Sequence, residues 1–139
     1  MILTQESNIT FATFGVERGI QVLKETGFDA IDMSLFGMSS DPDFIFSTDD
    51  WKENAFKVRR WSDEAGIPFR QCHAPYRFSA EMRANYDTEV IPRIARAIEV
   101  AGILGAKMIV VHPRKLPGYQ YPAVAEECFK LNMDFYKTL

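Results

Sequence analysis

The chain has only two cysteines, Cys72 and Cys128, among its 139 residues. Two cysteines cannot build a disulfide framework, and this pair is not spaced as the CxxC motif of metal and redox sites. We therefore expect both to be small, buried apolar residues. The sequence also lacks any stretch near the roughly 18 apolar residues of a membrane span, and its amino terminus has no signal-like basic and apolar segment. These absences predict a cytoplasmic protein with no membrane partner.

Basic residues are fewer than acidic ones, 16 against 19, which gives a net charge of −3. Proteins that coat nucleic acid neutralise many phosphates with Lys and Arg, so nucleic acid is not the expected partner. The patterns GxGxxG, Walker P-loop, HExxH and GxSxG are absent, which removes the usual nucleotide-binding and serine-hydrolase signals. With 47% apolar and 25% charged residues, the composition fits one globular domain over residues 1–139.

A helix-turn-strand unit is repeated three times along the chain. The segments KETGFDAIDMS, DEAGIPFRQCH and GILGAKMIVVH each contain a helix end, a glycine, a short turn, a strand and a polar residue at the strand tip. A glycine directly after a helix takes the left-handed conformation that other residues resist, so we expect it at all three turns. The glycines are Gly27, Gly66 and Gly105 and the tips are Ser34, His73 and His112, successive members of each set being 39 residues apart.

The spacing of apolar residues predicts a helix before each of these strands. The first should cover residues 16–23, and a strand near Ile2 to Gln5 should precede it. The second should span Trp51 to Ala65 and begin with a capping box formed by Asp50 and Glu53.

The carboxyl-terminal part of the chain predicts two further helices. One covers residues 91–102, with Pro92 in the first turn, where a missing N–H costs least, and with Asp87 or Thr88 as its cap. Pro122 should open the last helix. The apolar stripe of this last helix consists of Val124, Cys128, Leu131 and Phe135.

Strands that alternate with helices predict right-handed crossovers and a parallel sheet. Such a pattern suits either a (β/α)8 barrel or an open doubly wound sheet. A full barrel needs roughly 250 residues, whereas this chain has 139. The sequence therefore predicts an α/β fold of four β/α units, without a linker or a second domain.

The two histidines are predicted at the carboxyl ends of neighbouring strands, the side that carries function in parallel α/β folds. Neutral imidazoles bind zinc, manganese and related divalent ions, so His73 and His112 are candidate metal ligands. The 39-residue spacing places Asp32, Gln71 and Val110 two positions deeper on the same face. A catalytic metal needs about three protein ligands, so the set is incomplete. Each histidine could instead be structural or contact a substrate.

Candidate substrate contacts lie around these strand ends. Asp32 could bind the metal or accept a hydrogen bond from a neighbouring side chain, because an unpaired buried carboxylate is costly. Ser34 is the tip of the first strand of the repeat. Tyr76 and Arg114 follow the two histidine strands, where they could hold a phosphate or sugar hydroxyls. A solvated loop charge is the alternative interpretation of Arg114.

The segments LKETGFDAIDMSLF, CHAPY and LGAKMIVVHP together resemble the N-terminal half of the xylose isomerase-like TIM barrels. This superfamily contains sugar phosphate isomerases and epimerases and endonuclease IV, and the resemblance covers essentially the whole chain. It implies a parallel (β/α)4 half of a (β/α)8 barrel. In members of the endonuclease IV type, the histidines that correspond to His73 and His112 are zinc ligands. In the sugar enzymes, later strands supply most metal ligands, and these histidines contact substrate or support the site.

The resemblance implies three alternative functions for the chain. The first is the N-terminal fragment of a metal-dependent sugar or sugar-phosphate isomerase or epimerase, inactive alone because the carboxylate base lies in the missing half. A divalent ion would polarise the carbonyl and hydroxyl oxygens beside the transferred proton. The second is an endonuclease IV-like phosphodiesterase acting on abasic DNA, which the acidic composition disfavours. The third is a non-catalytic half-barrel that associates with itself.

A half-barrel leaves the edges of its first and last strands unpaired, and such edges tend to find partners. We therefore expect the chain to form a homo-oligomer through these edges, with two halves closing an approximate barrel. Sedimentation equilibrium should show a dimer or a larger assembly at high protein concentration. A compact monomer under the same conditions would contradict this expectation.

Overall fold

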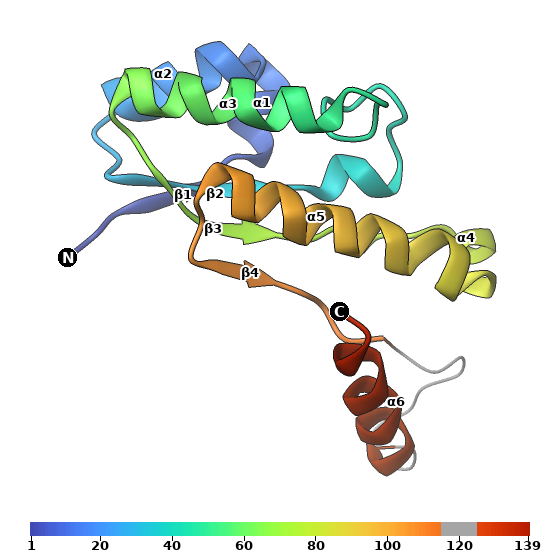
Figure 1. Ribbon diagram of the computed structural model, residues 1–139. Helices are drawn as coiled ribbons and strands as arrows, with labels where there is room; N and C mark the ends of the chain where they lie inside the picture. The colour runs from blue at the N-terminus through green and yellow to red at the C-terminus, as the bar shows by residue number, and fades with distance from the viewer. Residues whose placement is uncertain (115–124) are drawn as a thin grey trace.

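A computed structural model describes residues 1–114 and 125–139, and it contains one four-stranded parallel sheet (Figure 1). The strands follow one another in space in the order of the sequence, and each pairs in parallel with the next. The predicted α/β class and the parallel sheet are therefore confirmed. The strands are β1 (Thr4–Glu6), β2 (Ala30–Ser34), β3 (Phe69–His73) and β4 (Met108–Val110).

Three helices form a layer over one face of the sheet: α2 (Val16–Glu25), α3 (Trp51–Ala65) and α5 (Ile91–Leu104) (Figure 1). The seven-residue helix α1 (Asn8–Phe14), which the apolar spacing did not predict, packs against α2. Helix α6 (Ala125–Lys137) stands apart from this layer, beyond the carboxyl end of β4 (Figure 1). Among the described residues, no helix is long and apolar enough to cross a membrane.

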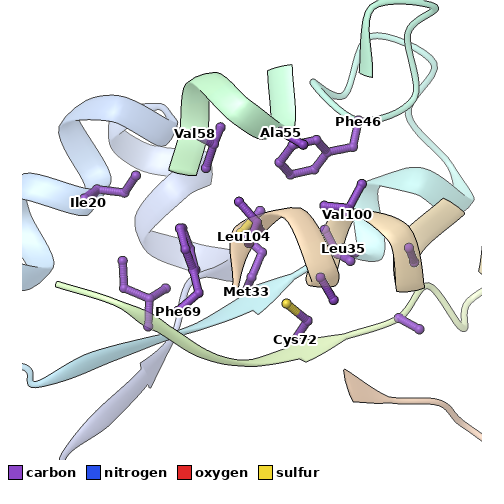
Figure 2. Close-up of a cluster of buried hydrophobic side chains, with 14 of the residues drawn as sticks. Ile20, Met33, Leu35, Phe46, Ala55, Val58, Phe69, Cys72, Val100 and Leu104 are labelled. Atoms are coloured by element: carbon purple, nitrogen blue, oxygen red, sulfur yellow. The ribbon is translucent and has the colours of Figure 1, made fainter. Parts of the chain in front are cut away.

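The core lies between the sheet and this helix layer. Figure 2 shows Met33 of β2 and Cys72 of β3 directed toward the helices, and both belong to the buried cluster that includes Val58 of α3 and Leu104 of α5. Each large apolar side chain that is fully buried stabilises the fold by about 1.5–3 kcal/mol. Because side chains alternate along a strand, this packing turns the intervening residues of β2 and β3 to the opposite face.

The predictions for the helix ends are correct for the glycines and wrong for the amino-terminal cap of α3. Gly27, Gly66 and Gly105 all have positive φ, between 66° and 88°, as predicted. The bounds of α3 are those predicted, but the Asp50 side chain makes no capping hydrogen bond. The prediction of a capping box was wrong because Asp50 has φ −84° and ψ 19° rather than the extended backbone of a capping residue.

The segment between β3 and α5 is more irregular than predicted. It contains a short helix α4 (Ala80–Ala84), capped by the Ser79 hydroxyl, and a π-helical turn η2 (Tyr86–Val90). Asp87 and Thr88 lie inside this turn and do not cap α5. The turn runs directly into α5, so α5 has no separate amino-terminal end for a side chain to cap. Pro92 occupies the first turn of α5, as predicted.

The last helix begins, within the described residues, at Ala125. Pro122 and Val124, predicted to open it, lie outside the described residues. Phe135 is buried on α6, whereas Cys128 and Leu131 are only half-buried. The predicted stripe therefore faces the protein, with Phe135 packed against the residues that precede and begin α5.

The register between β3 and β4 differs from the one that the 39-residue repeat predicted. Ser34 pairs with His73, as the repeat requires, but His73 pairs with Val110 instead of His112. His112 thus lies two residues beyond the position opposite His73. A shift of two residues keeps a side chain on the same face of the sheet, so both histidines still project to the face without the helix layer.

Three glycine-to-alanine variants test how the helix ends are stabilised. Gly66→Ala should lower the free energy of unfolding by about 1 kcal/mol, because a left-handed backbone penalises a Cβ. Gly105→Ala should cost about as much, since its backbone is also left-handed and its Cβ would meet only the end of the flexible Arg59 side chain, which can move aside.

The matched control is Gly102→Ala, an exposed position inside α5 where an added Cβ meets nothing within 4 Å. This change should raise stability by about 0.5–1 kcal/mol. Urea unfolding of the three variants measures the differences. A stabilising Gly66→Ala would contradict the left-handed helix end.

Candidate functional site

Polar residues form two rows across the face of the sheet that lies opposite the helix layer. In the first row, Glu6, Asp32 and Gln71 pair in register across β1, β2 and β3. In the second row, nearer the carboxyl ends, Ser34 pairs with His73. A sheet face that served only for packing would be apolar, whereas these two rows carry acidic, amide, hydroxyl and imidazole groups. This face is therefore the candidate site.

Asp32 accepts hydrogen bonds from one residue of each row. Its Oδ2 accepts a hydrogen bond from Gln71 Nε2 at 2.7 Å, and its Oδ1 lies 3.0 Å from His73 Nδ1. A carboxylate oxygen can only accept, so His73 Nδ1 carries the proton and donates it. The other ring nitrogen, Nε2, is then left with a free lone pair. Of the two roles that the sequence left open for Asp32, the structure shows the one in which it accepts hydrogen bonds from neighbouring side chains.

The chain leaves the sheet immediately after His73. Ala74 still donates its N–H to the Val110 carbonyl at 2.9 Å, which continues the parallel pairing by one step. Pro75 has no N–H to donate, so the pairing stops there. The turn places the Tyr76 ring against His112, with ring centroids 4.3 Å apart. The proline after the first histidine thus serves to bring an aromatic ring over the second.

The two histidines and two aromatic rings form one cluster. The His73 and His112 centroids are 6.3 Å apart, and the rings are tilted by 30°. Phe36, in the short helix η1 (Phe36–Ser39) after β2, meets His73 and Tyr76 edge-on, at 6.0 and 4.7 Å between centroids. Phe36 could not be predicted as part of this cluster from the sequence, because an apolar residue after a buried strand usually packs in the core.

His112 is held in its neutral form by its surroundings. Partial burial lowers its pKa below the ordinary value of 6.5, and the nearby His73 ring lowers this pKa further. A neutral imidazole can accept a proton or bind a metal ion through a free lone pair, whereas an imidazolium can do neither. His112 therefore offers a ring nitrogen as an electron-pair donor near neutral pH.

Cys72 takes no part in this chemistry. Its side chain is fully buried in the core under the helices, as predicted, and burial raises the pKa of its thiol to about 12, with the Asp32 charge adding to the effect. A thiol with so high a pKa is almost entirely protonated near neutral pH and is a poor nucleophile. Cys128 is half-buried rather than buried.

Ser34 is buried beside His73, and its hydroxyl oxygen has no hydrogen-bond partner among the described residues. Its backbone N–H donates to the Ser7 hydroxyl at 3.0 Å, so the strand end is fixed while the side chain is not. A buried hydroxyl without a partner costs about 1–3 kcal/mol. The hydrogen-bonding capacity of this oxygen is therefore unused.

Arg114 does not join the histidine cluster. Its guanidinium lies over the Tyr86 ring, 4.1 Å from the centroid, and its backbone N–H and carbonyl bond to the Asn132 side chain of α6. The structure thus brings together Asp32, Ser34, His73, Tyr76 and His112. Arg114 lies instead between Tyr86 of η2 and helix α6.

The metal site predicted from the two histidines is not complete among the described residues. Within residues 1–114 and 125–139, no group of three or more His, Cys, Asp or Glu side chains is placed to hold a metal ion. Asp32 is engaged with His73 Nδ1, and this contact fixes the orientation of the imidazole.

Comparisons with protein-family models, with curated proteins and with solved structures found no match to the chain. The resemblance to xylose isomerase-like barrels therefore stays a prediction from the sequence.

The lowered pKa of His112 can be measured by NMR titration of its imidazole. We expect a value below 6.5 in the wild-type chain. His73→Gln removes the neighbouring charge but not the burial, so the pKa should rise only part of the way. Protonated His112 is disfavoured in the fold. The free energy of unfolding should therefore be highest above pH 6.5, the ordinary pKa, and should decrease as the pH falls from there through the lowered pKa of His112. A wild-type value at or above 6.5 would contradict the arrangement.

Proposed function

We propose that this chain is the N-terminal half of a (β/α)8-barrel enzyme, a metal-dependent sugar or sugar-phosphate isomerase or epimerase, inactive on its own. The observation that carries the proposal is the Asp32–His73–His112 arrangement at the carboxyl ends of parallel strands. Binding and catalytic groups of parallel α/β barrels gather at this end.

The open face of the sheet supports a half-barrel. All-parallel sheets occur almost only where both faces are covered, because their crossover connections place helices over the sheet and their strands are rich in apolar residues. Here the described helices α2, α3 and α5 cover one face, and the other carries the polar rows (Figure 1). In a closed barrel this second face becomes the interior. The polar rows would then line the cavity in which substrate binds.

His73 and His112 would provide two ligands to a divalent ion such as zinc or manganese, and the remaining ligands would come from the second half of the barrel. When bound, the ion would polarise a carbonyl and an adjacent hydroxyl oxygen of the sugar. Asp32 keeps the Nδ1–H tautomer of His73, which directs the lone pair of Nε2 away from the carboxylate.

The other residues of the cluster are assigned to substrate binding. The unpartnered Ser34 hydroxyl is suited to a sugar hydroxyl, since it can both donate and accept. The Tyr76 and Phe36 rings wall the cluster with apolar surface, which strengthens electrostatic interactions inside it by excluding water. The carboxylate base that moves the proton is proposed to lie in the other half.

Zinc and manganese titrations of the chain test the metal ligands. We expect wild-type binding by isothermal titration calorimetry, and a loss of affinity of tenfold or more in His73→Ala and in His112→Ala. Asp32→Asn should weaken binding by about tenfold or more, because it changes the tautomer and orientation of His73.

Tyr76→Phe is the matched control, because it keeps the ring beside His112 and removes only the hydroxyl. It should bind the metals with wild-type affinity. Equal affinity in the wild-type chain and in both histidine variants would remove the two histidines as ligands. Absence of metal binding by the wild-type chain would favour a non-catalytic half-barrel.

A further inference from the structure

A second concave region lies at the same end of the sheet as the histidine cluster but is formed by different side chains. It has a volume of about 380 Å³ and lies between the loop after β2 and the first turns of α5. Pockets for small molecules have volumes of about 300–1,000 Å³. Because η1 contributes Phe36 to the histidine cluster and Met38 to this pocket, the two regions lie beside the same short helix. We call the second region the Arg96 pocket.

Arg96 is the positive charge that dominates the Arg96 pocket. Its Nη1 donates to the Ser47 carbonyl at 3.1 Å, and its guanidinium lies over the Trp51 ring, 5.3 Å from the centroid. Among the described residues, no carboxylate pairs with Arg96, and its Nε and Nη2 make no hydrogen bond. A guanidinium held on one edge by carbonyls and on its face by a ring is already positioned for an anion.

Ser47 supplies a second unused donor on the wall of the Arg96 pocket. Its hydroxyl oxygen is buried and has no hydrogen-bond partner among the described residues. Leaving a buried hydroxyl unpaired is costly, and an arriving acceptor would remove that cost. Ser40 also lines the pocket and is exposed to solvent. One guanidinium and two hydroxyls are the donor types that commonly surround a phosphate group.

The other charges near the pocket do not cancel this arrangement. Arg93 also lines the pocket, but its Nη1 lies 2.8 Å from Glu89 Oε2, so this pair adds little net charge. Asp41 is exposed, and its Oδ1 accepts a hydrogen bond from the Asp43 N–H at 2.9 Å. The charge of an exposed carboxylate is screened by water and salt. The buried part of the lining is therefore cationic.

We propose that the Arg96 pocket binds the phosphate group of a small phosphorylated molecule. Nε and Nη2 of Arg96 bind two phosphate oxygens, and the Ser47 hydroxyl donates to one of them. The site is separate from the histidine cluster and does not depend on the proposed metal chemistry.

The test is a titration of the ¹⁵N-labelled chain with sodium phosphate and with glycerol phosphate, monitored by two-dimensional NMR at constant ionic strength. Saturable shifts are expected at the amides of Ser40, Ser47 and Arg96. Ser47→Ala should weaken phosphate binding by about tenfold, since it deletes a hydrogen bond to a charged group. Its melting temperature should not fall, because the hydroxyl has no partner among the described residues.

Arg96→Lys keeps the charge but loses the planar fork, and it should also weaken binding by about tenfold. Two variants serve as controls: His73→Ala, which alters the histidine cluster, and Arg60→Lys, which changes an exposed arginine on α3. Both should bind phosphate like the wild type. Shifts that do not saturate, that chloride reproduces, or that persist unchanged in Ser47→Ala would overturn the proposal. Loss of binding in His73→Ala would assign the phosphate to the histidine cluster instead.

Discussion

Parallel pairing between β2 and β3 places Asp32 two residues below the level of His73 on the same face of the sheet, where the carboxylate accepts a hydrogen bond from Nδ1–H. The rest of the cluster follows from this contact. Once Nδ1 is the protonated nitrogen, Nε2 is a lone-pair donor, and the ring plane is fixed against rotation. His112 and Tyr76 then pack around a ring whose position is already determined. Without the carboxylate, His73 could adopt either tautomer.

The repeated unit made much of the fold predictable from the sequence. Three helix ends with a glycine and three strands with polar tips define the strand order, because short right-handed crossovers place consecutive strands side by side. The positions of Asp32 and His73 follow from the same repeat, since both lie on strands whose pairing has the predicted register. The bounds of α3 agree with the sequence because its apolar residues face a buried sheet.

Other features depend on contacts that a repeat does not encode. The register of β4 shifted by two residues relative to the repeat, so His112 lies beyond β4 and meets Tyr76 rather than standing opposite His73. The site also includes Phe36, whose position depends on the path of η1. The Arg96 pocket could not be predicted from the sequence for the same reason. Ser47 and Arg96 are far apart in the chain, and the path of the loop after β2 brings them into contact. Arg114 was placed by Tyr86 and α6, away from the strand ends.

The tautomer of His73 tests the central claim most directly. Nitrogen NMR of the imidazole, at a pH where the ring is neutral, distinguishes a proton on Nδ1 from a proton on Nε2. The account requires the Nδ1–H form in the wild-type chain and its loss or mixing in Asp32→Ala. Predominance of the Nε2–H form in the wild-type chain would contradict the hydrogen bond to Asp32, and with it the availability of Nε2 to a ligand.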